Sequence, residues 1–524
     1  MLHLTKPDNI LAVLGVSALI SIFSIVFSSN SLMALGAFLA GLAGAMILSR
    51  NFVYVGSRFR FTGVLSASTL LATGLGTVIA YTSFETAEEW SFYLNRKGIL
   101  DSSTVATAQL AVDLFCLCLF LLGLFARRRA LTKQISSTSS WEPTLDSKLL
   151  LKIANLPRNT RLTFLLLWSG FLVSLYQLYL LYTGKFGFLW QGVTNRKEGG
   201  LKFVNPEMEL LLVVVPPIIF ILGFLLLKLK EFESDKLAIF LYCSIAIVQL
   251  MWFITAASRG QFAFNTLVFL FGVRIYILGQ SIKFNKRNIF KIAIVTASII
   301  FIAYAGIQFT SFMRFLANEG VNFTSYSLTG KFSYLAQELV NYYSGKYSTL
   351  DSGEFESKLS QNLSTRPFVL SGFAILLERL ADEPVLLGED LWSSFLQSIP
   401  GFLFPGKYSL LTQESLYRAR LDISEAELSD LADSYYLSAF IDFSWLGLFI
   451  YPVVIYLLFI LTLRITLKSS SMLLHVLATG SLFTLCLRGG ESSMIGFFVN
   501  LRDLLIFVIV ITLCRFWFYR KSKS

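Results

Sequence analysis

The sequence predicts an all-α membrane protein, a polytopic bundle of about 12 transmembrane helices. Hydrophobic residues make up 55% of the 524 residues, and the mean hydropathy is +0.65. Apolar runs of about 20 residues with almost no charge recur along the chain, and each is long enough to cross the hydrocarbon layer. Because a helix satisfies its own backbone hydrogen bonds in lipid, each run is expected to be helical.

The apolar runs define the expected domain organisation. The predicted spans are residues 10–28, 31–49, 63–83, 105–126, 162–183, 209–227, 237–257, 262–281, 289–311, 435–463, 471–487 and 493–514. The chain therefore divides into a transmembrane part (1–311), a large loop (312–434) and a second transmembrane part with a tail (435–524). A structureless loop of that length would be unusual. Its aromatic clusters and the capping box Ser424 to Glu427 predict a small helical cap.

Lys and Arg gather in alternate loops. The basic segments are Arg50 to Arg60, Arg127 to Arg161, Lys228 to Lys236, Lys283 to Arg287 and the tail with Arg520. Basic loops stay in the cytoplasm, so both termini are expected there, and the segment 312–434 is expected outside. Because the net charge of +11 is spread over these loops, we expect no nucleic-acid partner.

Cysteine and histidine usage argues against metal and redox chemistry. All five cysteines lie in apolar runs, and the two histidines are His3 and His475. This pattern fits neither a disulfide framework nor a zinc site. The sequence therefore predicts no cofactor.

Two arginines are expected in short outer turns. Arg259 stands between Ser258 and Gly260 at the start of a predicted helix, and Arg488 precedes two glycines. Helix N-terminal N–H groups beside a guanidinium suit a phosphate or diphosphate. The alternative is an arginine that reaches lipid headgroups.

Charged residues within the spans have two interpretations. Arg502 and Asp503 lie in the last span, and Asp113 lies in the fourth. An unpaired charge there would cost about 2.5–3.5 kcal/mol. These residues are therefore expected either to pair within the bundle or to line a substrate cavity.

Further candidates lie in or beside the long loop. Arg314, Arg418 and Arg420 are candidate anion ligands, with solvated ion pairs as the alternative for the last two. Asp433 precedes the tenth span, where it is expected either to cap the helix or to accept a proton from a sugar hydroxyl.

The segment Ile399–Lys407, Ile-Pro-Gly-Phe-Leu-Phe-Pro-Gly-Lys, resembles the Pro-containing motif of Wzy-type O-antigen polymerases, which polymerise oligosaccharide repeat units. The turn at Arg259 is similar to that family as well. The segment from Asp433 to Leu437 resembles the start of a helix in the related O-antigen ligases, but Asp433 stands where those proteins have a histidine. This difference argues against a ligase.

The resemblance implies a glycosyltransferase in the bacterial inner membrane. It would transfer a growing glycan from undecaprenyl diphosphate onto an incoming lipid-linked repeat unit at the periplasmic face, without metal or nucleotide sugar. Arg259, Arg314, Arg418, Arg488 and Asp433 are the expected catalytic residues. Expected substrate-binding residues are Lys407, Tyr417, Arg420, Tyr435 and Arg502, with simple packing as the alternative for each tyrosine. A chain-length regulator and a flippase are the expected protein partners.

Two other functions compete with this one. One is an O-antigen ligase or another lipid-linked glycosyltransferase. The other is a polysaccharide flippase or transporter, which is expected to show internal repeats and charges spread over many spans. The notable polar residues instead gather at the predicted outer face, and this favours chemistry there.

Overall fold

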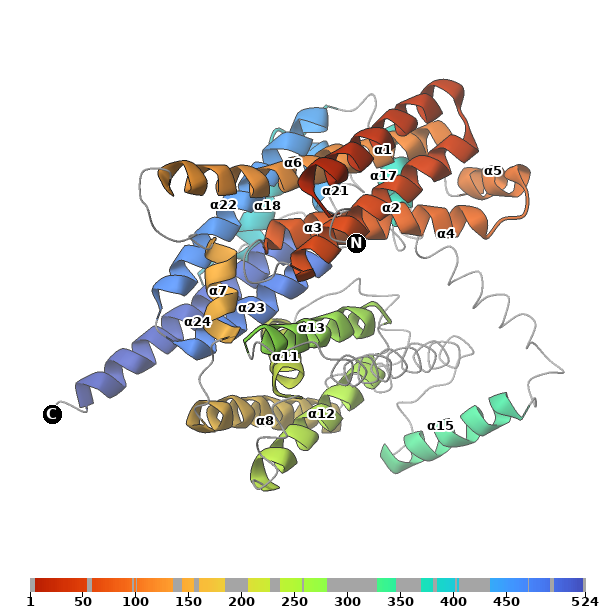
Figure 1. The fold of residues 1–524 in the computed structure, drawn as a ribbon. Helices are drawn as coiled ribbons and strands as arrows, with labels where there is room; N and C mark the ends of the chain where they lie inside the picture. The colour runs from red at the N-terminus through yellow and green to blue at the C-terminus, as the bar shows by residue number, and fades with distance from the viewer. Residues whose placement is uncertain are drawn as a thin grey trace, which may run out of the picture. The chain divides into compact units, whose positions relative to one another are not determined.

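The computed structural model describes most of the chain. The described residues are 5–53, 59–96, 99, 101–134, 144–154, 160–183, 206–226, 236–256, 259–279, 328–344, 369–379, 384–400, 403–404, 434–469, 471–490 and 494–521. All regular structure within these ranges is helical (Figure 1). They form two compact units, residues 1–153 with 364–524, and residues 154–363.

The first unit contains the N-terminal and C-terminal helices. Its elements are α1 (Pro7–Phe27), α2 (Asn30–Val53), α3 (Phe61–Leu70), the π-helical turn η1 (Leu71–Leu75), α4 (Gly76–Thr82), α5 (Ala87–Arg96), α6 (Ser102–Gln134), α7 (Leu145–Ala154), α17 (Leu370–Arg379), α18 (Glu389–Ser398), α21 (Tyr435–Phe443), the 3-10 turn η6 (Ser444–Leu446), α22 (Gly447–Lys468), α23 (Met472–Leu487) and α24 (Met494–Lys521). The second unit contains α8 (Thr160–Tyr182), α11 (Pro206–Leu226), α12 (Lys236–Ala256), α13 (Arg259–Gly279) and α15 (Leu328–Tyr343).

The all-helical class is confirmed for the described residues, which include 7 helical segments long and apolar enough to cross a membrane. These coincide with seven of the predicted spans, and four more predicted spans coincide with shorter apolar helices. The predicted span 289–311 lies outside the described residues. The chain is thus a helical membrane protein with several spans, and the count of about 12 stays a prediction.

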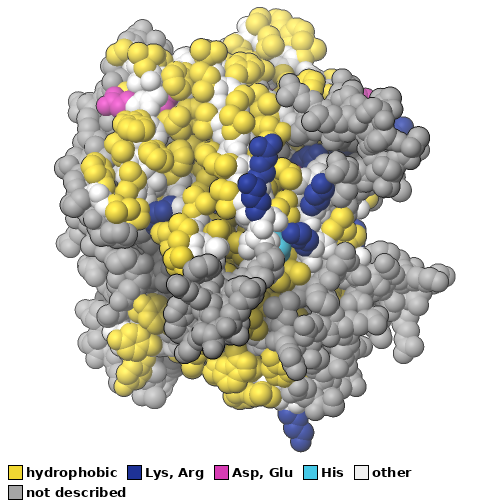
Figure 2. Space-filling view, turned by 90° about the vertical axis from the view of Figure 1, so that its left-hand side faces the viewer, with side chains coloured by type: hydrophobic (Ala, Val, Ile, Leu, Met, Phe, Trp, Pro, Cys, Tyr) yellow, Lys and Arg dark blue, Asp and Glu magenta, His cyan; other side chains and the backbone are white. Residues whose placement is uncertain are grey.

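The surface of these helices is suited to lipid rather than water. In α1, Val26 and Phe27 are 68% and 67% exposed, whereas Ser17, Ser21 and Ser24 are buried. Figure 2 likewise shows hydrophobic side chains over most of the described surface on one face. Apolar residues outside and small polar residues between helices are the arrangement that lipid favours.

Polar side chains join the helices of the first unit. Asp113 in α6 accepts hydrogen bonds from Ser17 Oγ of α1 at 2.7 Å and from Gln109 Nε2 at 2.8 Å. Of the two interpretations of Asp113, the structure therefore favours pairing within the bundle. A charge so far from water needs such donors.

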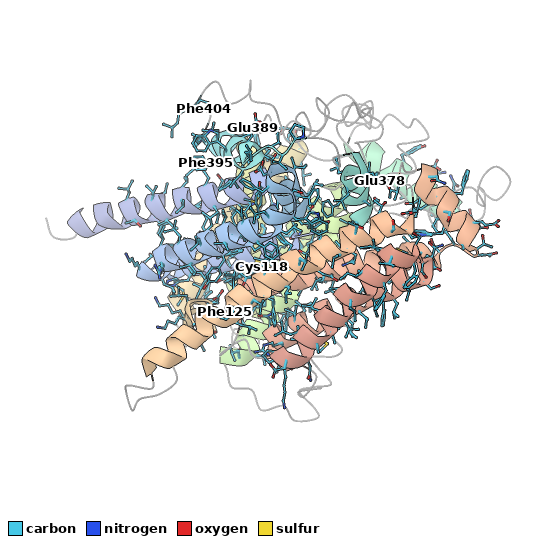
Figure 3. All side chains as sticks on the ribbon, turned by 90° about the horizontal axis from the view of Figure 1, so that it is seen from above. Cys118, Phe125, Glu378, Glu389, Phe395 and Phe404 are labelled. Atoms are coloured by element: carbon cyan, nitrogen blue, oxygen red, sulfur yellow. The ribbon has the colours of Figure 1, made fainter. Side chains whose placement is uncertain are left out.

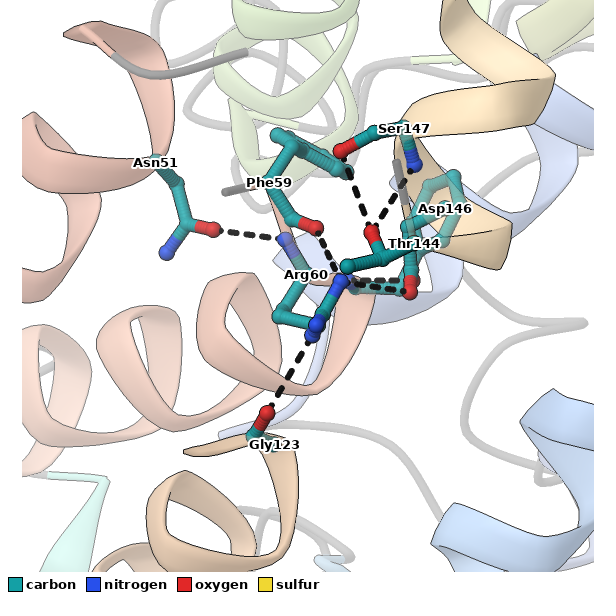
Figure 4. A network of polar contacts seen from close by, with 8 residues as sticks. Asn51, Phe59, Arg60, Gly123, Thr144, Asp146 and Ser147 are labelled. Atoms are coloured by element: carbon teal, nitrogen blue, oxygen red, sulfur yellow. Dashed lines mark hydrogen bonds and ion pairs between the residues drawn. The ribbon is translucent and has the colours of Figure 1, made fainter. Parts of the chain in front are cut away.

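A second polar network fixes the start of α3 (Figure 4). Asp146 of α7 accepts from the backbone N–H of Phe61 at 3.1 Å and lies 3.5 Å from the Arg60 guanidinium, whose Nε donates to the Gly123 carbonyl of α6. Burial raises the pKa of the Asp146 carboxyl, and Arg60 and the Phe61 N–H lower it in part. The network ties together three segments, the start of α3, α6 and α7.

The helices of the second unit are joined by side-chain amides and by close backbone approach. Gln249 Nε2 of α12 donates to Gln177 Oε1 of α8 at 2.5 Å. Helices α11 and α13 meet at Gly223 and Gly272, where an added Cβ would lie 2.0 Å and 2.2 Å from the facing carbonyl oxygens. Glycine is therefore required at both positions.

The predicted span 435–463 coincides with an apolar segment, Tyr435–Lys468, but two helices joined by a break form this segment. Helix α21 ends at Phe443, Ser444 has a φ of 50°, and α22 begins at Gly447. A side chain at position 447 would meet the Ala439 carbonyl oxygen at 1.7 Å. The hydropathy pattern did not reveal this break, since both helices are equally apolar.

The alternation of basic and acidic loops predicts the result of a topology experiment. Reporter fusions at residues near 90, 195 and 370 are expected outside, and fusions near 145, 232 and 520 inside. The measurement is paired alkaline phosphatase and green fluorescent protein activity at matched expression. Cytoplasmic signal from the fusion near 370 would contradict an extracytoplasmic loop.

Candidate functional site

Helix α18 in the long loop packs against α21 and α24. The two residues before α18, Leu387 and Gly388, have positive φ values of 51° and 93°. The segment before α18 is held by α21, because Leu386 N and Leu387 N donate to the carbonyls of Ile441 and Asp442 at 3.1 and 2.8 Å. This loop helix is therefore fixed directly onto the transmembrane bundle.

A buried carboxylate holds the N-terminus of α18. Asp442 accepts from the backbone N–H groups of Asp390 and Leu391 at 2.9 and 3.0 Å, and from the Tyr451 hydroxyl at 2.5 Å. The first N–H groups of a helix have no partner within the helix and carry partial positive charge. Asp442 satisfies two of them from the helix just before the break at Ser444.

A guanidinium holds the opposite end. Arg502 of α24 donates from Nη1 to the Ser398 carbonyl at 2.8 Å and from Nε to Asp503 Oδ1 at 2.6 Å. Free carbonyls at a helix C-terminus favour a cation. Both ends of α18 are thus bound by charged side chains of the sign that its dipole prefers, and we call this arrangement the α18 clamp.

Aromatic side chains continue the α18 clamp. Phe395 packs edge-to-face on Phe498 of α24 at 5.7 Å, and Trp392 stacks on Phe395 at 5.6 Å. The Trp392 side chain remains 61% exposed. Glu389, Phe395 and Phe404 lie near one another at one edge of the view in Figure 3.

The α18 clamp fixes the beginning of the Pro-containing motif. Ile399 and Pro400 follow α18 directly, and the backbone N–H groups of Leu403 and Phe404 donate to the Pro400 carbonyl at 2.9 and 3.1 Å. Leu403 is exposed. The turn therefore leaves the bundle from an anchored residue, Ser398.

Two predicted substrate-binding residues take part in this packing. Arg502 pairs with Asp503 and binds α18. Of the two interpretations of Arg502, pairing within the bundle and lining a substrate cavity, the structure therefore favours pairing. Tyr435 is fully buried, with its ring edge-to-face on Phe497 at 5.7 Å. Both residues position helices.

The capping interpretation of Asp433 is wrong. The N-cap of α21 is Ser434, whose Oγ accepts from the Leu437 N–H at 3.3 Å. Asp433 itself lies outside the described residues, as do Arg314, Lys407, Tyr417, Arg418 and Arg420.

The two turn arginines occupy different helix ends. Helix α13 begins at Arg259, as predicted, in the second unit. Arg488 instead follows the last residue of α23, and α24 begins only at Met494, so Arg488 does not stand at a helix N-terminus. A Cβ on Gly489 would lie 2.2 Å from Leu65 Cδ1, so the Arg488 turn packs closely on α3.

Asp442 and Tyr451 are the site residues that sequence reasoning missed. An aspartate inside an apolar run was the available signal, since buried charges in spans have partners or functions. It was overlooked because its partners, the N–H groups of α18, lie 51 and 52 residues away in the chain.

The described residues contain no group of three His, Cys, Asp or Glu side chains that could hold a metal ion. In comparisons with known proteins, no family model matches the chain, and no curated protein or solved structure matches it significantly.

Proposed function

We propose that the protein is an oligosaccharide repeat-unit polymerase of the bacterial inner membrane. It transfers a growing glycan from undecaprenyl diphosphate onto an incoming lipid-linked repeat unit at the periplasmic face. The observation that carries the proposal is the α18 clamp, because it anchors Ser398, the residue directly before the segment Ile399–Lys407, to the membrane helices. That segment is the one that resembles the polymerase motif.

The proposed chemistry is a displacement at a sugar carbon. The bond from that carbon to the diphosphate oxygen breaks, and a bond to an acceptor hydroxyl oxygen forms. Asp433 accepts the hydroxyl proton. Arg259, Arg314, Arg418 and Arg488 neutralise the charge that grows on the diphosphate, which stabilises the transition state more than the ground state.

The supporting residues have separate roles in this proposal. Lys407, Tyr417 and Arg420 contact the saccharide or its diphosphate from the long loop. Arg502 and Tyr435 act as positioning residues, since their described contacts are with α18 and α24.

Purified protein in detergent is expected to lengthen the glycan when it is given lipid-linked repeat units and no energy source. The measurement is the length distribution of the lipid-linked product on a gel. A heat-treated sample of the same protein is the control. Movement of the lipid across vesicles without elongation would contradict the proposal and favour a flippase, and transfer to lipopolysaccharide core alone would favour a ligase.

A further inference from the structure

A recess of about 340 Å³ lies between three elements of the first unit. Its walls come from the first turns of α6, the end of α17 and the break between α21 and α22. The lining residues are Ser103, Thr104, Thr107, Leu377, Glu378, Phe440, Ser444 and Trp445. Its size is at the small end of ligand pockets, about 300–1,000 Å³.

Hydrogen bonds fix the polar wall of this recess. Thr104 Oγ1 donates to Glu378 Oε1 at 2.7 Å, which joins α6 to α17. Asp101 accepts from the backbone N–H groups of Ser103 and Thr104 at 2.8 and 3.1 Å and so holds the first turn of α6 in place. The wall therefore presents three hydroxyl groups and one carboxylate in a set geometry.

Another part of the lining is aromatic. Trp445 is 40% exposed, and its ring lies edge-to-face on the buried Phe440 at 5.8 Å. Trp445 lies in the 3-10 turn η6 at the break between α21 and α22, and it lines the recess together with residues of α6. An exposed indole held by a second ring offers an apolar face with little loss of conformational entropy on binding.

The lining specifies the chemistry of the ligand. Among the described residues of this recess none is Lys or Arg, so it is unsuited to a diphosphate. A carboxylate, hydroxyls and an indole in one recess suit a molecule with hydroxyl groups on its edge and an apolar C–H face. Hydroxyl donors to a carboxylate form strong, charge-assisted hydrogen bonds. A pyranose ring has this combination.

We propose that this recess binds one uncharged pyranose ring of the membrane-linked saccharide. The inference rests on the proposed function for the identity of the saccharide. Figure 3 shows Glu378 beside the end of α6 that the charge pattern places outside, far along that helix from Phe125. The recess is thus a saccharide subsite, and its lining includes none of the four arginines proposed to bind the diphosphate.

The test is binding of the delipidated repeat-unit oligosaccharide, released by mild acid, to the full chain in detergent. Saturation-transfer NMR gives the affinity. Glu378→Gln and Trp445→Ala are each expected to weaken saccharide binding about tenfold or more. The first removes the charged hydrogen-bond acceptor for the sugar hydroxyls, and the second removes the aromatic face for the sugar ring. Leu446→Ala is the matched control, since Leu446 is the next residue and its exposed side chain does not line the recess. In an elongation assay the two recess variants are expected to raise KM for the acceptor and spare kcat.

Three outcomes of the binding experiment would overturn the subsite. They are wild-type affinity in both recess variants, no saccharide binding by the wild type, and Glu378-dependent binding of phosphoethanolamine in place of the saccharide, which would indicate a lipid headgroup site. Saccharide binding without elongation would instead contradict the proposed polymerase function but not the proposed subsite. Elongation with wild-type KM in both recess variants would contradict the proposed subsite but not the proposed polymerase function.

Discussion

Replacing Arg488 with alanine is expected to abolish long glycan chains and to lower the elongation rate about 100- to 1,000-fold, the usual loss for one donor to a developing oxyanion. Arg259→Ala, Arg314→Ala and Arg418→Ala are expected to act in the same way. A diphosphate leaving group gains charge as its bond to the sugar breaks, so fixed guanidinium donors act mainly in the transition state. The measurement is product chain length at matched expression.

Lysine variants separate this role from a structural one. Arg488 lies at the C-terminus of α23, where any cation is favourable. Arg488→Lys should therefore keep the fold fully but restore elongation only in part, because lysine lacks the bidentate fork that grips phosphate oxygens. Wild-type ladders from all four alanine variants would exclude the arginine mechanism.

The same assay tests the proposed base. Asp433→Asn should cut activity strongly and leave the fold unchanged, because Ser434 is the residue that caps α21. A wild-type ladder from Asp433→Asn would remove its role in proton transfer.

Asp442→Ala is expected to lower the stability of the first unit strongly. It leaves the N–H groups of Asp390 and Leu391 and the Tyr451 hydroxyl without their carboxylate. Each unsatisfied buried donor costs about 1–3 kcal/mol. We expect a lower unfolding midpoint in detergent and faster proteolysis within residues 384–400.

Glu389→Ala is the matched control for Asp442→Ala. Glu389 lies in the same first turn of α18 but is exposed, so its removal costs only a helix-dipole interaction of about 0.3–1 kcal/mol. Equal effects of the two substitutions would show that Asp442 does not anchor α18.

The length of the apolar runs and their lack of charge predicted the helical class and the position of most membrane helices, because both are local properties of the sequence. The spans near α1, α2 and α6 begin within a few residues of their predicted starts. The break at Ser444 was not predictable in this way, since it depends on contacts between Gly447 and Ala439 and on the docking of α18.

The candidate site was predicted only in part, because its residues come from segments far apart in the sequence. The sequence left two interpretations of Arg502 open, pairing within the bundle and lining a cavity, and the structure favours pairing with Asp503. The partner at Ser398 was not predictable, because 104 residues separate it from Arg502. The recess with Glu378 and Trp445 likewise combines three segments that no local pattern relates.

The two charged anchors of α18 also determine how this part of the chain opens. Separating α18 from the bundle breaks the contacts of Asp442 and Arg502 together, and each charge then loses its partners in a poorly hydrated setting. Helix α18 and the first turns of α24 should therefore exchange their amide hydrogens in one cooperative event. The rate of exchange should follow the separation of α18 from the bundle and not local motion of the loop.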